Sequence, residues 1–281
     1  MNRHIDPGFS LVELLVVVTI IVLLLALLAP ALEKAIDAAE RARCAANLDA
    51  WGIAVANYTV ENKNKLLTTF RRIGASTHPS WVWGNHEKAR QYPDQWSAAA
   101  MQRYVQGADL ENHIFGRLWY CPANASPNRD SYNKRLVEQT SIDDPTGWNQ
   151  YGFFISDYGY FARADVWGKR QATMPDMLTG RYLAAGKLLM ADSIFRISQS
   201  RAYAWNHGRE GYSRWDPGFG GPLQTDPALI TGANQLFGDG SVHWKSDFQP
   251  KEMNESSDSI GWVSSNGATQ TPDRTGHLHF Y

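Results

Sequence analysis

The chain has 281 residues, of which 43% are hydrophobic and 20% charged, and its formal net charge is −1 at pH 7. This balance of acidic and basic side chains provides no basic surface to recruit nucleic acid, so no nucleic-acid partner is expected. The length allows a membrane segment followed by one large domain or two small ones.

An apolar run at residues 9–29 is the most distinctive segment. As a helix its 21 residues extend about 31 Å, close to one hydrocarbon thickness of a bilayer. Its polar residues are Ser10, Glu13 and Thr19. A carboxylate at the membrane centre costs about 2.5–3.5 kcal/mol, so a simple anchor has no use for Glu13. Arg3 precedes the run, which favours a cytoplasmic N-terminus and export of the remainder.

Gly8, Phe9 and Glu13 resemble the processing signal of type IV prepilins and type II secretion pseudopilins, in which a short leader ends in Gly, followed by Phe and, as fifth mature residue, Glu. The resemblance implies that a prepilin peptidase removes residues 1–8 and that the new Phe9 amine is methylated. It implies that Glu13 neutralises the Phe9 amine of a neighbouring filament subunit, because a half-paired buried charge is penalised heavily. Pro30 occupies a position where this family often has a proline that kinks or melts the helix.

Three other interpretations of this segment stay open. It could be a plain signal anchor in which Glu13 is incidental. It could be an ordinary cleaved signal peptide, since Ala29-Pro30-Ala31 has the small-x-small pattern of a cleavage site, although the apolar run is longer than the usual core. It could also be a buried core helix, although its length at the chain terminus argues against this.

A second helical pattern follows at residues 32–60. One apolar residue recurs every three or four positions, which predicts an amphipathic helix with one stripe packed on a domain. The stripe contains Cys44, Leu48, Trp51, Val55 and Tyr58. The polar residues 61–65 end this helix. The resemblance to pilins implies that residues 9–31 form the transmembrane and filament-core helix and that the C-terminal half packs on an antiparallel sheet.

Residues 61–281 predict an aromatic-rich, β-rich globular domain with large loop-rich insertions. Strands are predicted at 115–120, 151–162 and 187–192, and a short helix at 98–105. A hairpin is predicted at 234–245, where Asp239-Gly240 supplies the turn. The predicted fold class is therefore α+β, pilin-like, with a long N-terminal helix on an antiparallel sheet.

Cys44 and Cys121 both follow the membrane segment, in a compartment that permits oxidation. A disulfide between them would close a long loop and contribute about 4–5 kcal/mol in the chain-entropy model. Two separate buried thiols are an equal alternative. The chain has no CxxC pattern and no Cys/His spacing typical of zinc.

The late strand patterns add to the resemblance. Met190-Ala191-Asp192 and the segment 237–242 look like those of a large group of pseudopilin-like proteins with a long C-terminal domain. That group often has a histidine ten residues before the Asp-Gly pair. Here this position holds Leu229, and the nearest upstream candidate is His207, as if a loop had been inserted.

A metal site is a further hypothesis. Asp192 and Asp239, with His207 and His243, could converge at one sheet end, where acids and loop carbonyls could bind calcium. The simpler interpretation of Asp239 is a turn residue. His277 and His279 would share a strand face and suit zinc, but they lack a third ligand and are more simply an exposed terminal strand. No other cofactor is expected.

The 11 tryptophans suggest either a sheet core or a sugar-stacking platform, the latter with Trp81 and Trp83 on one strand face. The expected function is structural, without catalysis, because no recognised catalytic motif occurs in a convincing context. The expected protein is a single-pass inner-membrane pilin or pseudopilin subunit with an extracytoplasmic C-terminal domain in the periplasm or a surface filament. Its expected partners are prepilin peptidase, identical or related pilin subunits, an assembly platform and membrane lipid. The alternative is a membrane-anchored carbohydrate-binding or carbohydrate-active domain.

Overall fold

A computed structural model describes the chain at residues 10–67, 81–84, 93, 95–105, 107, 116–124, 153–160, 188–196, 203–208, 229–246, 259–260 and 263–264. The chain divides into two compact units, Met1–Ala42 and Arg43–Tyr281. The boundary falls inside the predicted amphipathic helix, so the last part of that helix belongs to the globular unit.

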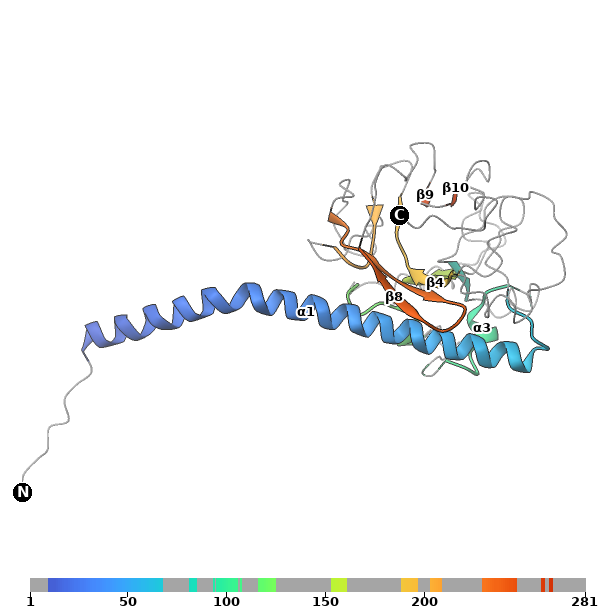
Figure 1. Ribbon diagram of the computed structural model, residues 1–281, viewed down its shortest axis with the longest axis horizontal. Helices are drawn as coiled ribbons and strands as arrows, with labels where there is room; N and C mark the ends of the chain where they lie inside the picture. The colour runs from blue at the N-terminus through green and yellow to red at the C-terminus, as the bar shows by residue number, and fades with distance from the viewer. Residues whose placement is uncertain are drawn as a thin grey trace, which may run out of the picture. The chain divides into compact units, whose positions relative to one another are not determined.

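Helix α1 extends from Leu11 to Glu61 and passes through both predicted helical segments (Figure 1). Pro30 lies inside it, and the helix continues without a break although proline provides no backbone N–H at that position. In the first unit the large apolar side chains from Leu11 to Ile36 are all exposed. Among the described residues of its own unit, this part of α1 therefore has no apolar partner.

The C-terminal part of α1 has one buried stripe, which confirms the predicted amphipathic pattern. Its buried residues are Cys44, Leu48, Trp51, Ala54, Val55 and Thr59. The helix ends where predicted, because Lys63 and Asn64 adopt positive φ angles of 56° and 62°. The backbone N–H of Asn64 donates to the carbonyl of Thr59 at 2.7 Å, which caps the last turn in the manner of a Schellman motif.

The main sheet has four antiparallel strands in the order β3-β4-β7-β8. The strands are β3 (Tyr158–Tyr160), β4 (Leu188–Asp192), β7 (Ala233–Phe237) and β8 (Val242–Lys245). The predicted strand at 187–192 and the predicted hairpin are confirmed. Within the predicted strand at 151–162 the structure has two shorter strands, β2 (Phe153–Ile155) and β3, and β3 is the one that belongs to this sheet. With α1, this sheet gives the α+β fold class that the sequence indicated.

The β7–β8 turn is longer than a two-residue hairpin loop. Of the predicted Asp239-Gly240 pair, Gly240 has the positive φ, at 87°, and its N–H donates to the carbonyl of Phe237 at 3.0 Å. Asp239 accepts hydrogen bonds from the backbone N–H and the hydroxyl of Ser241, and these hold the pKa of Asp239 below its usual value. Asp239 is thus a turn residue.

The remaining elements are short. Three pairs of short strands are present in the described part of the chain: β1 (Trp81–Trp83) with β2 (Phe153–Ile155), β5 (Phe195–Arg196) with β6 (Tyr203–Ala204), and β9 (Ser259–Ile260) with β10 (Val263–Ser264). The short helix α3 covers Ala98–Met101, and the 3-10 turn η1 covers Arg117–Trp119.

The predicted strand at 115–120 is wrong. Gly116, at φ 82°, leads into the 3-10 turn η1, which places Trp119 in the core. The helix predicted at 98–105 is shorter than expected and ends at Met101.

An aromatic cluster forms the centre of the globular unit. Trp51 from α1 lies against Trp96 and Trp119, with ring centroids 5.2 and 4.3 Å away, and Trp96 stacks on Tyr160 at 4.0 Å. These three tryptophans and Trp205 are at most 1% exposed, so they serve as core residues and not as a surface platform for sugars. The side chains of Trp81 and Trp83 lie outside the described part.

Candidate functional site

The N-terminus of α1 has a reciprocal pair of hydrogen bonds. The backbone N–H of Ser10 donates to Oε2 of Glu13 at 2.9 Å, and the backbone N–H of Glu13 donates to Oγ of Ser10 at 3.2 Å. This is a capping box, the S-x-x-E arrangement that satisfies donors left free at a helix start. Glu13 therefore has a local role within its own chain, which the sequence interpretation missed although Ser10-x-x-Glu13 was its signal.

The rest of the apolar segment also satisfies its polar groups. The hydroxyl of Thr19 donates to the carbonyl of Val16 at 2.8 Å, so it requires no partner from another helix. An 18-residue window of α1 has a mean hydropathy of 3.2 and is 0% buried. By length and composition this helix can cross a membrane. Gly8 and Phe9, the predicted processing residues, lie outside the described part of the chain.

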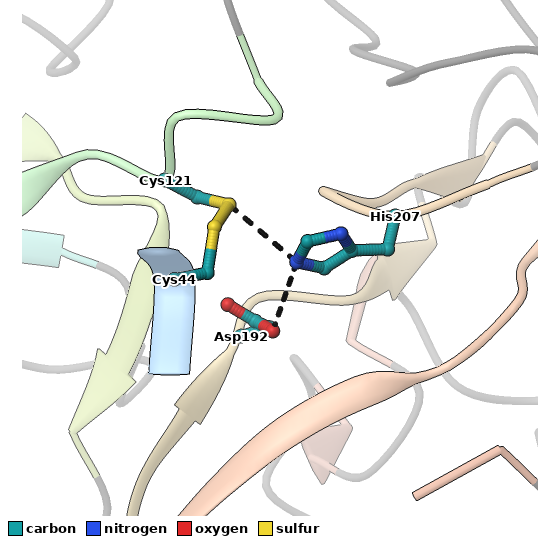
Figure 2. Close-up of side chains that lie close together, drawn as sticks. All are labelled: Cys44, Cys121, Asp192 and His207. Atoms are coloured by element: carbon teal, nitrogen blue, oxygen red, sulfur yellow. Dashed lines mark hydrogen bonds and ion pairs between the residues drawn. A yellow bond between two sulfur atoms is a disulfide. The ribbon is translucent and has the colours of Figure 1, made fainter. Parts of the chain in front are cut away.

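Cys44 and Cys121 form a disulfide within the globular unit, the pairing that the sequence left open (Figure 2). Their separation of 77 residues means that the bond joins the last part of α1 to a distant segment. Neighbouring contacts support it. Asn47 donates from Nδ2 to the carbonyl of Tyr120 at 3.1 Å, and Nε1 of Trp51 donates to the carbonyl of Leu118 at 2.9 Å.

Asp192 and His207 complete a buried cluster beside this disulfide. Nε2 of His207 lies 3.3 Å from Oδ2 of Asp192 and 3.5 Å from Sγ of Cys121. Figure 2 shows the imidazole directing this nitrogen between the sulfur and the carboxylate. Both side chains are 1% exposed, and Nδ1 of His207 has no hydrogen-bond partner among the described residues.

The position of His207 is fixed by the segment around it. Its carbonyl accepts from the backbone N–H of Thr231 at 3.2 Å, and its ring meets that of Trp244 edge-on at 5.3 Å. Gly208 follows, and a Cβ there would lie 2.0 Å from Nε1 of Trp205, so only glycine fits beneath that indole. The loop thus brings His207 to the sheet end although it does not occupy the position typical of the pseudopilin-like group.

Asp157 organises a polar network next to the cluster. Its carboxylate accepts from the backbone N–H of Cys121 and from Nδ2 of Asn124, each at 3.0 Å. Its backbone carbonyl accepts from Nδ2 of Asn206 at 2.7 Å. These residues are at most 2% exposed, so the network satisfies polar groups that burial would otherwise penalise. Sequence reasoning did not identify Asp157, Asn124 or Asn206, since none lies in a recognised motif.

The cluster does not have the geometry of a catalytic triad. In a nucleophile–His–Asp relay, the nucleophile and the acid contact opposite ring nitrogens. Here Cys121 and Asp192 both approach Nε2 of His207, and the sulfur is already bonded to Cys44. This arrangement does not activate a nucleophile.

Asp192 and Asp239, the residues predicted to share a calcium site, lie at opposite ends of the β4–β7 pairing. Ala191 is opposite Gln235, whereas Leu188 is opposite Phe237, just before the turn that contains Asp239. Asp192 instead accepts from the backbone N–H and Nδ2 of Asn234, at 2.7 and 2.9 Å. The structure therefore does not bring the two acids together. His277 and His279 lie outside the described residues.

Comparison with known families places a known signal at the N-terminus. Residues 6–29 match the sequence model of the prokaryotic N-terminal methylation motif. This is the type IV pilin and pseudopilin signal, and the match confirms the resemblance that Gly8, Phe9 and Glu13 indicated. No curated protein and no solved structure matches the chain.

Proposed function

We propose that this protein is a type IV pilin-like or pseudopilin-like subunit that is held in the inner membrane by α1 and assembles into a filament. The observation that carries the proposal is the methylation motif at residues 6–29, which overlaps an apolar helix whose large side chains from Leu11 to Ile36 are exposed in the part of the unit that the structure describes. A helix of this kind requires either lipid or other copies of itself to cover it.

The first step of the proposed function is processing. A prepilin peptidase cuts between Gly8 and Phe9, and the new Phe9 amine is methylated. Arg3 keeps the leader in the cytoplasm, and the unit from Arg43 onward lies outside the inner membrane, in the periplasm or on a surface filament. An assembly platform in the inner membrane then extracts the processed subunit.

Assembly in this proposal uses the charge of Glu13. Before cleavage the capping box with Ser10 gives the carboxylate a partner inside its own helix, which lowers the cost of keeping it in lipid. After cleavage the cationic Phe9 amine of a neighbouring subunit is a stronger partner. Because an unpaired buried charge is costly, only one axial register pairs every carboxylate with an amine. The role is structural, with no catalysis.

The mass of the purified mature N-terminus tests the processing step. The expected result is a chain that starts at Phe9 and carries one additional methyl group. A chain that keeps Met1 contradicts the proposal, and a start at Leu32 indicates an ordinary secreted protein.

Substitution of Glu13 by Gln tests the assembly step separately. Glutamine can still accept from the Ser10 N–H, so the capping box is retained while the charge is lost. The proposal expects Glu13→Gln to insert in the membrane normally and to be absent from filaments. Thr19→Val is the matched control, since the Thr19 hydroxyl bonds within its own helix. Filaments that incorporate Glu13→Gln as well as the native chain would contradict charge pairing.

A further inference from the structure

Four potential metal-ligating side chains meet at one point in the globular unit. Cys44, Cys121, Asp192 and His207 each offer one ligand atom, and these atoms all lie within 4.8 Å of one another. They come from α1, from the segment after η1, from the end of β4 and from the loop after β6. All four residues are at most 2% exposed, so the point is shielded from water.

We propose that the chain, while its two cysteines are thiols, binds one zinc ion through Cys44, Cys121, Asp192 and His207, and that this state and the disulfide exclude each other. Cysteines are synthesised as thiols, so the reduced chain precedes the oxidised one. The proposal does not depend on filament assembly, because every ligand lies in the unit Arg43–Tyr281.

The distances already match two edges of a zinc tetrahedron. Bonds of about 2.0–2.1 Å to nitrogen or oxygen and about 2.3 Å to sulfur place a tetrahedral N–O pair about 3.4 Å apart and an N–S pair about 3.6 Å apart. Nε2 of His207 lies 3.3 Å from Oδ2 of Asp192 and 3.5 Å from Sγ of Cys121. The sulfur–sulfur edge is the main change, since two thiolate ligands stand about 3.8 Å apart.

The ligand types select zinc and not calcium. Two sulfurs and an imidazole are typical zinc ligands, whereas calcium takes six to eight oxygens. Four protein ligands also close the coordination sphere, which is typical of structural sites and leaves no open position for a substrate. Asn234 orients the carboxylate of Asp192, because its backbone N–H and its Nδ2 both donate to Oδ2, and Nδ2 of Asn206 lies 3.4 Å from Oδ1. Zinc on Oδ2 would take the place of the contact with His207 and would share that oxygen with the Asn234 donors.

Reduction of the Cys44–Cys121 bond takes two electrons from a phosphine, which becomes its oxide with the oxygen of water, while the two water protons go to the thiols. Zinc then displaces both thiol protons, and both thiolates bind the ion. In the zinc-bound state the imidazole of His207 would be neutral with its proton on Nδ1, so that the lone pair of Nε2 binds the ion.

The experiment uses the full chain in detergent micelles. One sample is reduced with a phosphine that is then removed without air, and its oxidised counterpart is kept unreduced. Zinc is titrated into each against a chromophoric chelator. The expected result is one tightly held zinc per reduced chain and none per oxidised chain. A reduced chain that holds no zinc, or an oxidised chain that holds it equally well, overturns the proposal.

Two ligand variants and two matched controls identify the site. His207→Ala and Asp192→Asn are expected to weaken zinc binding at least about tenfold, the scale of losses around zinc sites. His243→Ala and Asp239→Asn change the same residue types at exposed positions and are expected to leave affinity unchanged. Native affinity in His207→Ala overturns the assignment. Near-ultraviolet circular dichroism of each oxidised variant checks that the buried tryptophans keep their packing.

X-ray absorption of the native reduced chain gives an answer that requires no variant. The proposal expects two sulfur ligands and two nitrogen or oxygen ligands around zinc. Cobalt in place of zinc is expected to give the intense visible bands of a tetrahedral ion together with a thiolate charge-transfer band. Four sulfur ligands, which would require two chains, or an octahedral cobalt spectrum, contradicts the site.

Discussion

The two halves of α1 have the same secondary structure and opposite surroundings. From Leu11 to Leu32 every large apolar side chain is exposed. From Cys44 to Thr59, by contrast, the side chains of one stripe are at most 2% exposed. In the second half apolar residues alternate with polar ones at helical spacing, so one face packs and the other stays in water. In the first half apolar residues surround the helix, so no single face can satisfy them.

This difference shows where each half obtains its stabilising contacts. The second half is fixed by its own chain, through a disulfide at Cys44, hydrogen bonds from Asn47 and the ring contacts of Trp51. The first half satisfies its polar groups locally, through Ser10, Glu13 and Thr19, and leaves its apolar surface to the environment. Substitutions in the two halves should therefore affect different measurements.

The largest expected effect is loss of the disulfide, which would break the covalent attachment of the second half. Replacing Cys44 and Cys121 together with Ser removes a cross-link between residues 77 apart. The chain-entropy model gives a loss of about 4.5 kcal/mol in the free energy of unfolding. Urea unfolding of the full chain in micelles, followed by tryptophan fluorescence, measures it. A loss below about 1 kcal/mol would show that the bond adds little to the noncovalent contacts.

Next is Trp51→Ala, which sharpens the contrast between the buried and exposed faces of the second half. Trp51 is 0% exposed and donates to Leu118, so its removal should cost about 3–5 kcal/mol in the same unfolding measurement. Ile53→Ala, on a residue that is 59% exposed, should change stability by less than about 0.5 kcal/mol. Equal effects for the two variants would contradict the one-sided packing.

Ile20→Arg tests the first half, where the partner is lipid. A charge near the centre of the span should raise the free energy of membrane insertion by about 3 kcal/mol, or roughly a hundredfold in the insertion equilibrium. Extraction of membranes with alkaline carbonate measures the inserted fraction, with Ile20→Leu as control. Normal insertion of Ile20→Arg would mean that another part of the chain holds it in the membrane.

The smallest effect concerns the β7–β8 turn of the globular unit. The Ser241 hydrogen bonds lower the pKa of Asp239, so their contribution is full above its usual pKa of 3.8 and is lost as the pH falls through the lower folded value. Carboxyl-carbon NMR titration should give a midpoint below 3.8. Ser241→Ala should return the midpoint only part of the way, because the backbone N–H remains. An unchanged midpoint in Ser241→Ala would show that the Ser241 hydroxyl contributes nothing to the lowered pKa of Asp239.

Sequence reasoning succeeded where the pattern is local. The strand 188–192 was predictable from its short continuous apolar run, and all five of its residues are buried. The hairpin 234–245 was predictable because alternation and a Gly-containing turn lie within a dozen residues. The strand predicted at 115–120 was wrong because the position of Trp119 depends on contacts with Trp51 and Trp96. Both of these residues are distant in sequence, so a local pattern does not reveal the contacts.

The two candidate sites differ in the same way. Most of the N-terminal signal could be predicted from the sequence, because Gly8, Phe9 and Glu13 are close together in the chain. The cluster around His207 was not, because Cys44, Cys121 and Asp192 approach it only after the sheet and α1 have packed. The sequence placed His207 outside the expected spacing, and only the folded loop, fixed by Gly208 under Trp205, shows where its ring goes.

The Cys44–Cys121 bond also determines how the chain would respond to tension. A load applied between the two ends of the polypeptide passes from sulfur to sulfur, so residues 45–120 carry none of it. The bypassed stretch would extend by roughly 260 Å if it were pulled straight, at about 3.4 Å per residue over the 77-residue separation. Those residues can extend under load only after this bond is reduced.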